Sequence, residues 1–157
     1  MKNKLKLLFG FAAVILFVAI GWIYFFQEIE YTPNLYKEIV QATKDDMYAT
    51  AGWYSKRMQK EDFHKLVRDL ISNEELDLWT LDVGMGYASE YGYCDCIGLI
   101  EKQVKEVENR IGTEWVVKVN DRITKQYGFS DWSEWENYKE TFITPRLKGL
   151  ITNCSQN

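Results

Sequence analysis

Residues 7–26 form the longest apolar run of the chain and contain no charged side chain. A helix rises about 1.5 Å per residue, so this run matches the roughly 30 Å hydrocarbon core of a bilayer. Lys2, Lys4 and Lys6 precede the run, and cationic residues are retained on the cytoplasmic side. The pattern therefore predicts a single-pass signal-anchor in the inner membrane, with residues 1–6 in the cytoplasm and the remaining chain in the periplasm or its equivalent.

A cleaved signal peptide is the alternative interpretation of this run. Ala19, Ile20 and Gly21 form a small-x-small sequence of the kind that signal peptidases cut. Cleavage there would leave a run of large apolar residues, beginning with Trp22, at the new N-terminus, which favours the retained anchor. Both interpretations place residues 27–157 outside the cytoplasm.

Past the anchor, apolar residues recur every three or four positions, which is typical of amphipathic helices. The clearest examples are residues 60–72, which contain Phe63 and Leu70, and residues 96–111, which carry a stripe starting at Ile97. The other stretches that we expect to be helical are 34–43, 45–58, 76–87, 132–144 and the residues after Pro145.

Three short stretches have a less regular pattern. Ser72 and Glu75 form a capping box that predicts a helix start. The glycines and tyrosines of residues 82–93 also fit a loop between Leu81 and Asp95. The alternation in residues 113–120 fits a strand, but we expect a helix there because no second strand is evident.

These elements together predict an all-α fold for the part of the chain that follows the anchor. We expect one compact bundle of six or seven short helices over residues 34–152. A short linker over residues 27–33 would join this bundle to the anchor, and residues 153–157 would form a tail.

The predicted domain is acidic. All 23 acidic residues and 16 of the 19 Lys and Arg residues follow residue 26, which gives this part a net charge of −7. Such a charge repels phosphates, so we expect no nucleic-acid partner, and it favours a protein partner with a basic surface. The sequence has no phosphate-binding loop, zinc-protease motif or serine-hydrolase motif, so no cofactor is expected and a non-catalytic role is favoured.

The cysteines Cys94, Cys96 and Cys154 offer a disulfide in an oxidising compartment. A bond from Cys94 or Cys96 to Cys154 would close a loop of about 60 residues and stabilise the fold by about 4 kcal/mol. The remaining thiol would be either an inert buried group or a link to a second copy in a homodimer. With His64 the cysteines make a zinc-type donor set, but their spacing does not match known zinc motifs, and no metal is expected.

Two segments are candidates for a contact surface, because each combines aromatic rings with acidic groups. The residues that we expect to bind a partner are Tyr87, Glu90, Tyr91 and Tyr93 in the first segment, and Asp131, Trp132, Glu134, Trp135 and Glu136 in the second.

The function that these features predict is a membrane-anchored, extracytoplasmic protein-binding module. An inhibitor, an immunity-type protein or an accessory protein of the cell envelope would fit this description. The alternative is a cell-wall domain that binds or cleaves glycans with the acids and rings of residues 131–136. A third hypothesis is a structural subunit that acts through its membrane helix.

Overall fold

A computed structural model describes residues 15–19, 21–22, 27–42, 46–73, 77–110, 117–118, 126–127 and 132–156. Within these residues the fold is all-α apart from one minimal strand pair, as predicted. Most of the predicted anchor lies outside this set. In the part of the chain that the structure describes, no helix combines the length and the apolar character that a membrane crossing requires.

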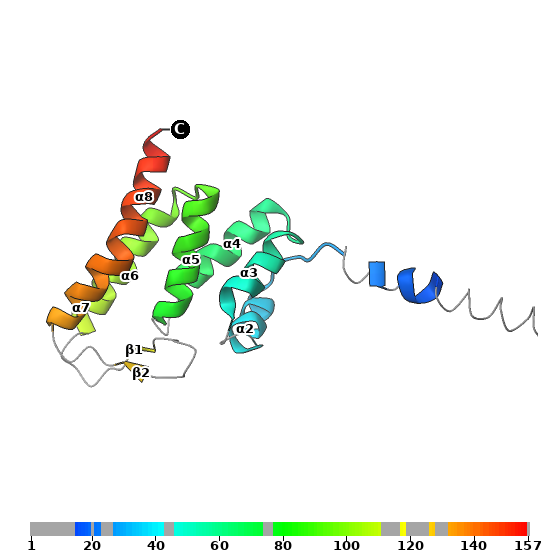
Figure 1. Cartoon of the computed structure of the whole chain (residues 1–157), viewed down its shortest axis with the longest axis horizontal. Helices are drawn as coiled ribbons and strands as arrows, with labels where there is room; N and C mark the ends of the chain where they lie inside the picture. The colour runs from blue at the N-terminus through cyan, green and yellow to red at the C-terminus, as the bar shows by residue number, and fades with distance from the viewer. Residues whose placement is uncertain are drawn as a thin grey trace, which may run out of the picture.

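The first three labelled helices follow the predicted periodicity closely (Figure 1). They are α2 (Pro33–Ala42), α3 (Met47–Ser55) and α4 (Lys60–Ile71). The Asp46 side chain accepts a hydrogen bond from the backbone nitrogen of Ala49 at 3.2 Å, which satisfies a free donor at the start of α3. The buried stripe of α4 contains the apolar positions that its period predicts.

Helix α5 (Leu78–Tyr91) starts later and ends later than the sequence suggests. Asp77 is its N-cap and accepts from the backbone nitrogen of Trp79 at 2.9 Å, so the cap is not the predicted Ser72. Residues 82–91 are helical, which corrects the loop alternative for most of this segment. Gly92 ends the helix with a φ of 68°, a left-handed conformation that favours glycine.

The C-terminal half contains α6 (Cys96–Arg110), α7 (Trp132–Tyr138), a π-helical segment η1 (Lys139–Ile143) and α8 (Thr144–Ser155). The last three are continuous along the chain, and Pro145 lies in the first turn of α8. Because α8 continues to Ser155, most of the predicted tail is helical.

A short antiparallel pair interrupts the helical pattern. Strand β1 (Val117–Lys118) pairs with β2 (Gln126–Tyr127), with Val117 opposite Tyr127. The helix predicted over residues 113–120 is therefore wrong at these positions. The prediction failed because the partner strand is only two residues long and has no apolar alternation of its own.

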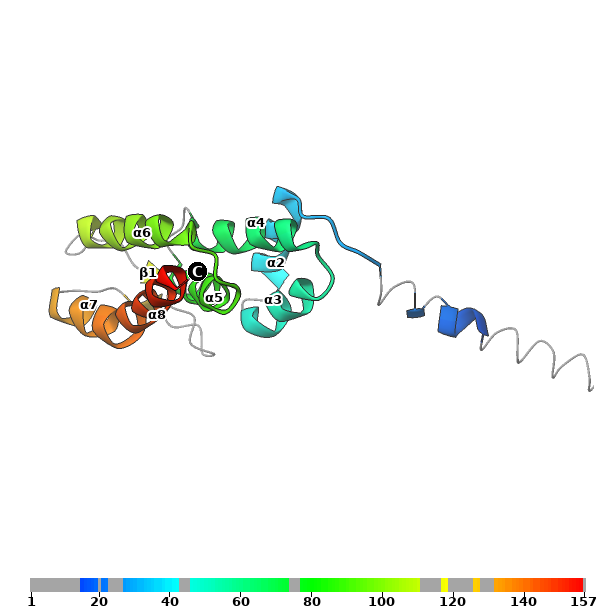
Figure 2. The same ribbon diagram turned by 90° about the horizontal axis from the view of Figure 1, so that it is seen from above.

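The helices pack in two layers, and α5 contacts α3, α4, α6 and α8. Seen from above, α4 and α6 lie along one side, with α3, α5, α7 and α8 along the other (Figure 2). Both views place α2 and α3 at one end of the domain and α7 at the opposite end (Figures 1 and 2). The largest fully buried side chains come from most of these helices and include Ile39, Phe63, Leu70, Met85, Ile100, Trp135 and Leu150.

Candidate functional site

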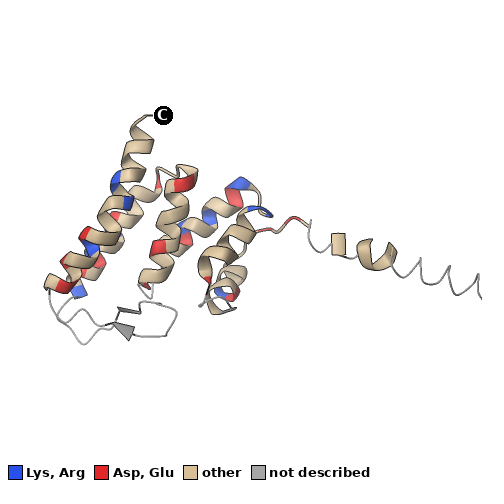
Figure 3. Ribbon diagram, in the orientation of Figure 1, with Lys and Arg blue, Asp and Glu red and all other residues tan. Residues whose placement is uncertain are grey.

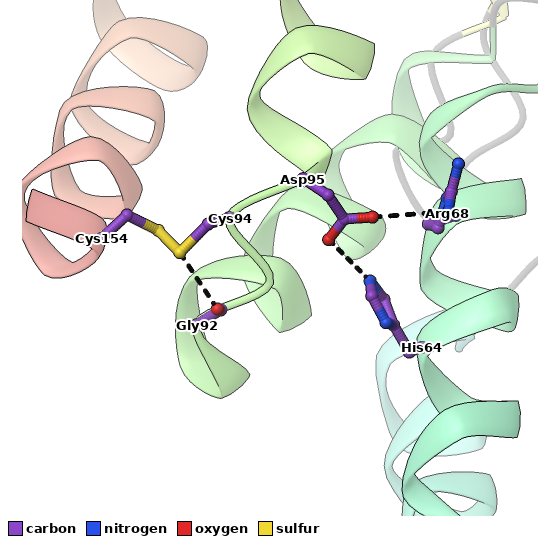
Figure 4. A network of polar contacts seen from close by, with 6 residues as sticks. All are labelled: His64, Arg68, Gly92, Cys94, Asp95 and Cys154. Atoms are coloured by element: carbon purple, nitrogen blue, oxygen red, sulfur yellow. Dashed lines mark hydrogen bonds and ion pairs between the residues drawn. A yellow bond between two sulfur atoms is a disulfide. The ribbon is translucent and has the colours of Figure 1, made fainter. Parts of the chain in front are cut away.

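A disulfide joins the turn before α6 to the C-terminal end of α8. It links Cys94 to Cys154, whose Cα atoms lie 5.7 Å apart, and it closes a separation of 60 residues (Figure 4). One of the two predicted pairings is thereby confirmed. Cys96 is fully buried, and burial together with the nearby Asp95 carboxylate raises the pKa of its thiol to about 12. The thiol therefore stays protonated, which matches the inert alternative for this residue.

Next to this turn lies a group of rings in mutual contact, which we name the aromatic cluster: Phe63, His64, Tyr87, Tyr91 and Tyr93. Phe63 contacts both Tyr87 and Tyr91 at 5.3 Å between ring centroids. Tyr93 stacks on His64 at 4.1 Å and on Tyr91 at 5.8 Å. The structure thus brings together the three tyrosines of the first predicted segment and adds two rings from α4.

The members of the aromatic cluster differ in their access to solvent. Tyr87 and Tyr93 are 8% and 6% exposed, whereas Tyr91 is 39% exposed and its neighbour Glu90 is exposed. Burial raises the pKa of both buried phenols, that of Tyr93 to about 12, so they remain neutral at physiological pH. Of the four residues predicted in this segment, only Tyr91 and Glu90 are accessible to a partner. The buried rings of Tyr87 and Tyr93 pack against the Tyr91 ring.

His64 of the aromatic cluster also belongs to a network of polar contacts with Asp95 and Arg68 (Figure 4). The Nε2 atom of His64 lies 2.8 Å from Oδ1 of Asp95, and Nη1 of Arg68 lies 3.5 Å from Oδ2 of the same carboxylate. All three side chains are partly exposed to solvent. Sequence reasoning missed this network because 31 residues separate His64 from Asp95, and no periodic pattern connects a helix face to a turn in a different part of the chain.

The same region contains donor atoms that a metal ion could use. One ligand atom each from His64, Asp95 and Cys96 lie within 4.8 Å of one another. The zinc set considered from sequence does not form, because Cys94 and Cys154 are bonded to each other. The Asp95 carboxylate already has the guanidinium of Arg68 at 3.5 Å, and the Cys96 thiol is held protonated. We therefore interpret these residues as an ion-pair network beside a buried thiol.

The second predicted segment does not form a single surface. Asp131 lies outside the described residues, and Trp132 is the first residue of α7. Trp135 is completely buried and donates from Nε1 to the Glu108 carboxylate at 3.3 Å, so this ring belongs to the core. Glu134 and Glu136 are exposed, but residues two apart on a helix do not face each other.

An open groove lies between α2 and the end of α4, away from either predicted segment. It has a volume of about 710 Å³, and its lining includes Tyr36, Lys37, Val40, Asp69 and Asn73. The sequence offers no signal for this groove, because it arises from the way in which two helices pack.

Comparison of the chain with protein-family models, with curated proteins and with solved structures finds no match.

Proposed function

We propose that this chain is a membrane-anchored, extracytoplasmic protein-binding module that presents Tyr91 to a partner with a basic surface. The observation that carries the proposal is the partly exposed Tyr91 ring, held from beneath by Phe63, Tyr87 and Tyr93. An aromatic side chain that is fixed before binding loses little conformational entropy when a partner covers it. Exposed rings of this kind are enriched among the residues that dominate binding energy.

Charge around the ring supports a basic partner. The carboxylates of Glu90 and Glu61 are exposed. In addition to burial, the charge of Glu90 raises the pKa of Tyr87 and the charge of Glu61 raises the pKa of Tyr93. Complementary charges steer a partner to a surface and fix its orientation. A role as an inhibitor, an immunity-type protein or an envelope accessory protein uses such a surface without any chemical reaction.

Two further observations support the proposed compartment. Disulfides persist in oxidising compartments and are rare in the cytosol, so the Cys94–Cys154 bond supports an extracytoplasmic domain. The uncharged run over residues 7–26 supports attachment to the inner membrane, with the N-terminus in the cytoplasm.

Site-specific photocrosslinking tests the proposal. The photoreactive amino acid p-benzoylphenylalanine replaces Tyr91 in the full chain, expressed in its own cells. Its matched control replaces Phe142, another partly exposed ring, which is 49% exposed and lies on η1. We expect a single protein adduct from position 91 and none from position 142.

Two results would count against this function. The same adducts from both positions, or no protein adduct from position 91, would remove the support for Tyr91 as a contact. Retention of glycan fragments by the purified chain, with loss of retention in a Tyr91→Ala variant, would instead favour the cell-wall alternative.

A further inference from the structure

The domain begins without a free linker after the uncharged run. The carbonyl oxygen of Gln27 accepts hydrogen bonds from Nη2 and Nε of Arg57, at 3.0 and 3.3 Å. The backbone nitrogen of Ile29 donates to the carbonyl of Arg57 at 2.8 Å, and Ile29 forms an isolated β-bridge with Met58. Glu28 is hydrogen-bonded to Gln59. The first residue after the run is therefore already attached to the turn between α3 and α4.

This attachment limits where the turn lies relative to a bilayer. If residues 7–26 fill the hydrocarbon core, Gln27 lies in the headgroup layer, which is about 5–7 Å thick on each side. Arg57 is in direct contact with Gln27, so the turn that contains it lies at the same depth or immediately above it.

The side chains at this turn suit a headgroup layer. Trp53 is 40% exposed on α3, and the guanidinium carbon of Arg57 lies 4.2 Å from the centroid of its ring. The Tyr54 ring meets Trp53 edge-on at 4.8 Å, and Lys56 is exposed beside them. Trp and Tyr favour the membrane interface, and cationic side chains reach lipid phosphates from that depth.

The charges of this region indicate whether attraction to anionic lipids would hold the turn at the bilayer. Residues of both signs lie at the turn between α3 and α4 (Figure 3), where Lys56, Arg57 and Lys60 are followed directly by Glu61 and Asp62 of the first turn of α4. Among those acids, Asp62 is paired with Lys65 at 2.7 Å. Because cations do not dominate, attraction to anionic lipid is not the main force. Instead, the short attachment through Gln27 would keep the turn close to the bilayer, and the exposed Trp53 side chain would contact the lipid headgroups.

We infer that Trp53 and Arg57 form a membrane-docking surface that lies in the phospholipid headgroup layer. The inference rests on the proposed anchor and adds to it a fixed orientation of the domain. The end with α2 and α3 faces the bilayer, and the end with α7 faces away from it (Figures 1 and 2).

Fluorescence quenching in nanodiscs tests the docking surface. The full chain is reconstituted in phosphatidylcholine nanodiscs in which a small fraction of the lipids carries a nitroxide on the headgroup. A fluorescent amino acid replaces Trp53 in one variant and Phe142 in the control. We expect several-fold stronger quenching at position 53 than at position 142.

A spacer variant tests the role of the attachment. A flexible insertion of about ten Gly and Ser residues between Phe26 and Gln27 adds a root-mean-square reach of about 16–19 Å, which lets the domain leave the headgroup layer. We expect quenching at position 53 to fall towards the value at position 142. Unchanged quenching would overturn the role of the short attachment.

The failures of the two proposals are distinguishable. Weak and equal quenching at positions 53 and 142, with the chain retained in the nanodiscs, would overturn the docking surface and leave the anchor in place. A chain that does not remain with the nanodiscs would overturn the anchor and the docking surface together.

Discussion

A hydrogen bond between the side chains of His64 and Asp95 connects α4 to the turn between α5 and α6, with Nε2 and Oδ1 2.8 Å apart. Asp95 follows the disulfide-bonded Cys94 in the chain, and the His64 ring stacks on Tyr93 within the aromatic cluster, so this hydrogen bond connects the disulfide turn to the cluster. Arg68, one turn further along α4, contacts the second oxygen of the same carboxylate at 3.5 Å. The Asp95 carboxylate thus connects two side chains of α4, those of His64 and Arg68, to the turn.

We predict that Asp95→Asn changes the stability of the fold only slightly. The side chains of His64, Arg68 and Asp95 are 30%, 53% and 45% exposed, and water screens ion pairs of this kind. The expected loss in the free energy of unfolding is below about 1 kcal/mol, smaller still at high salt. Urea denaturation at low and high ionic strength measures it, with Arg68→Gln as the control that removes only the longer contact. A loss of several kcal/mol would show that the pair is more than a surface contact.

Removal of the disulfide should have a much larger effect. The double variant Cys94→Ser, Cys154→Ser frees a loop of 60 residues, so we expect it to lose about 4 kcal/mol in the chain-entropy description. Thermal or urea unfolding of the oxidised chain and of the double variant measures the difference. A reductant should destabilise the original chain and leave the double variant unchanged, and an equal response of both would contradict the assignment.

The sequence predicts best those helices that have one polar face. The bounds of α4 and α6 agree with their apolar stripes because one side of each helix meets water. Helix α5 was harder to predict, since it packs against α3, α4, α6 and α8 and therefore lacks a continuous polar face. Its glycines resembled loop residues, whereas they allow close packing: a Cβ on Gly86 would lie 3.2 Å from the Tyr48 ring.

The candidate site was predicted in part. The tyrosines of residues 87–93 were identified from composition, and they do meet in one cluster. Which of them is accessible depends on tertiary packing, and so does the contact with Phe63 and His64 from another helix. Trp135 was predicted as a contact residue but is buried. Its spacing in the sequence fits either a surface or a core position, and only its burial and its hydrogen bond to Glu108 in the structure assign it to the core.

Glycine substitutions test the packing of α5 against α4. A Cβ on Gly84 would lie 2.7 Å from Cγ1 of Ile71 and 3.0 Å from its backbone nitrogen, so Gly84→Ala should destabilise the fold by about 1–3 kcal/mol. Gly98 on α6 has no atom within 4 Å of such a Cβ. Gly98→Ala should therefore stabilise the fold by about 0.5–1 kcal/mol through helix propensity. Thermal unfolding of both variants compares the two, and equal effects would contradict the close contact between α4 and α5.

The last prediction concerns the pH dependence of stability that arises from Glu108. A hydrogen bond from Lys139 at 2.8 Å, and a second one from Trp135, lower the pKa of this carboxyl below its ordinary value. A lowered pKa means that the folded state favours the ionised form. The stabilisation is therefore complete above the pKa of the unfolded chain, about 4.3, and is lost as the pH falls through the folded-state pKa.

Comparison with Glu108→Gln isolates this contribution. The variant should be less stable by about 1–2 kcal/mol near pH 7, and the difference should shrink as the pH falls below about 4. Urea denaturation over a series of pH values measures it. The control is Glu106→Gln, which removes a carboxylate from an exposed pair with Arg110 on the same helix and should change stability by no more than about 0.5 kcal/mol. A difference for Glu108→Gln that stays constant down to the most acidic pH would show that its carboxylate does not stabilise the fold through its charge.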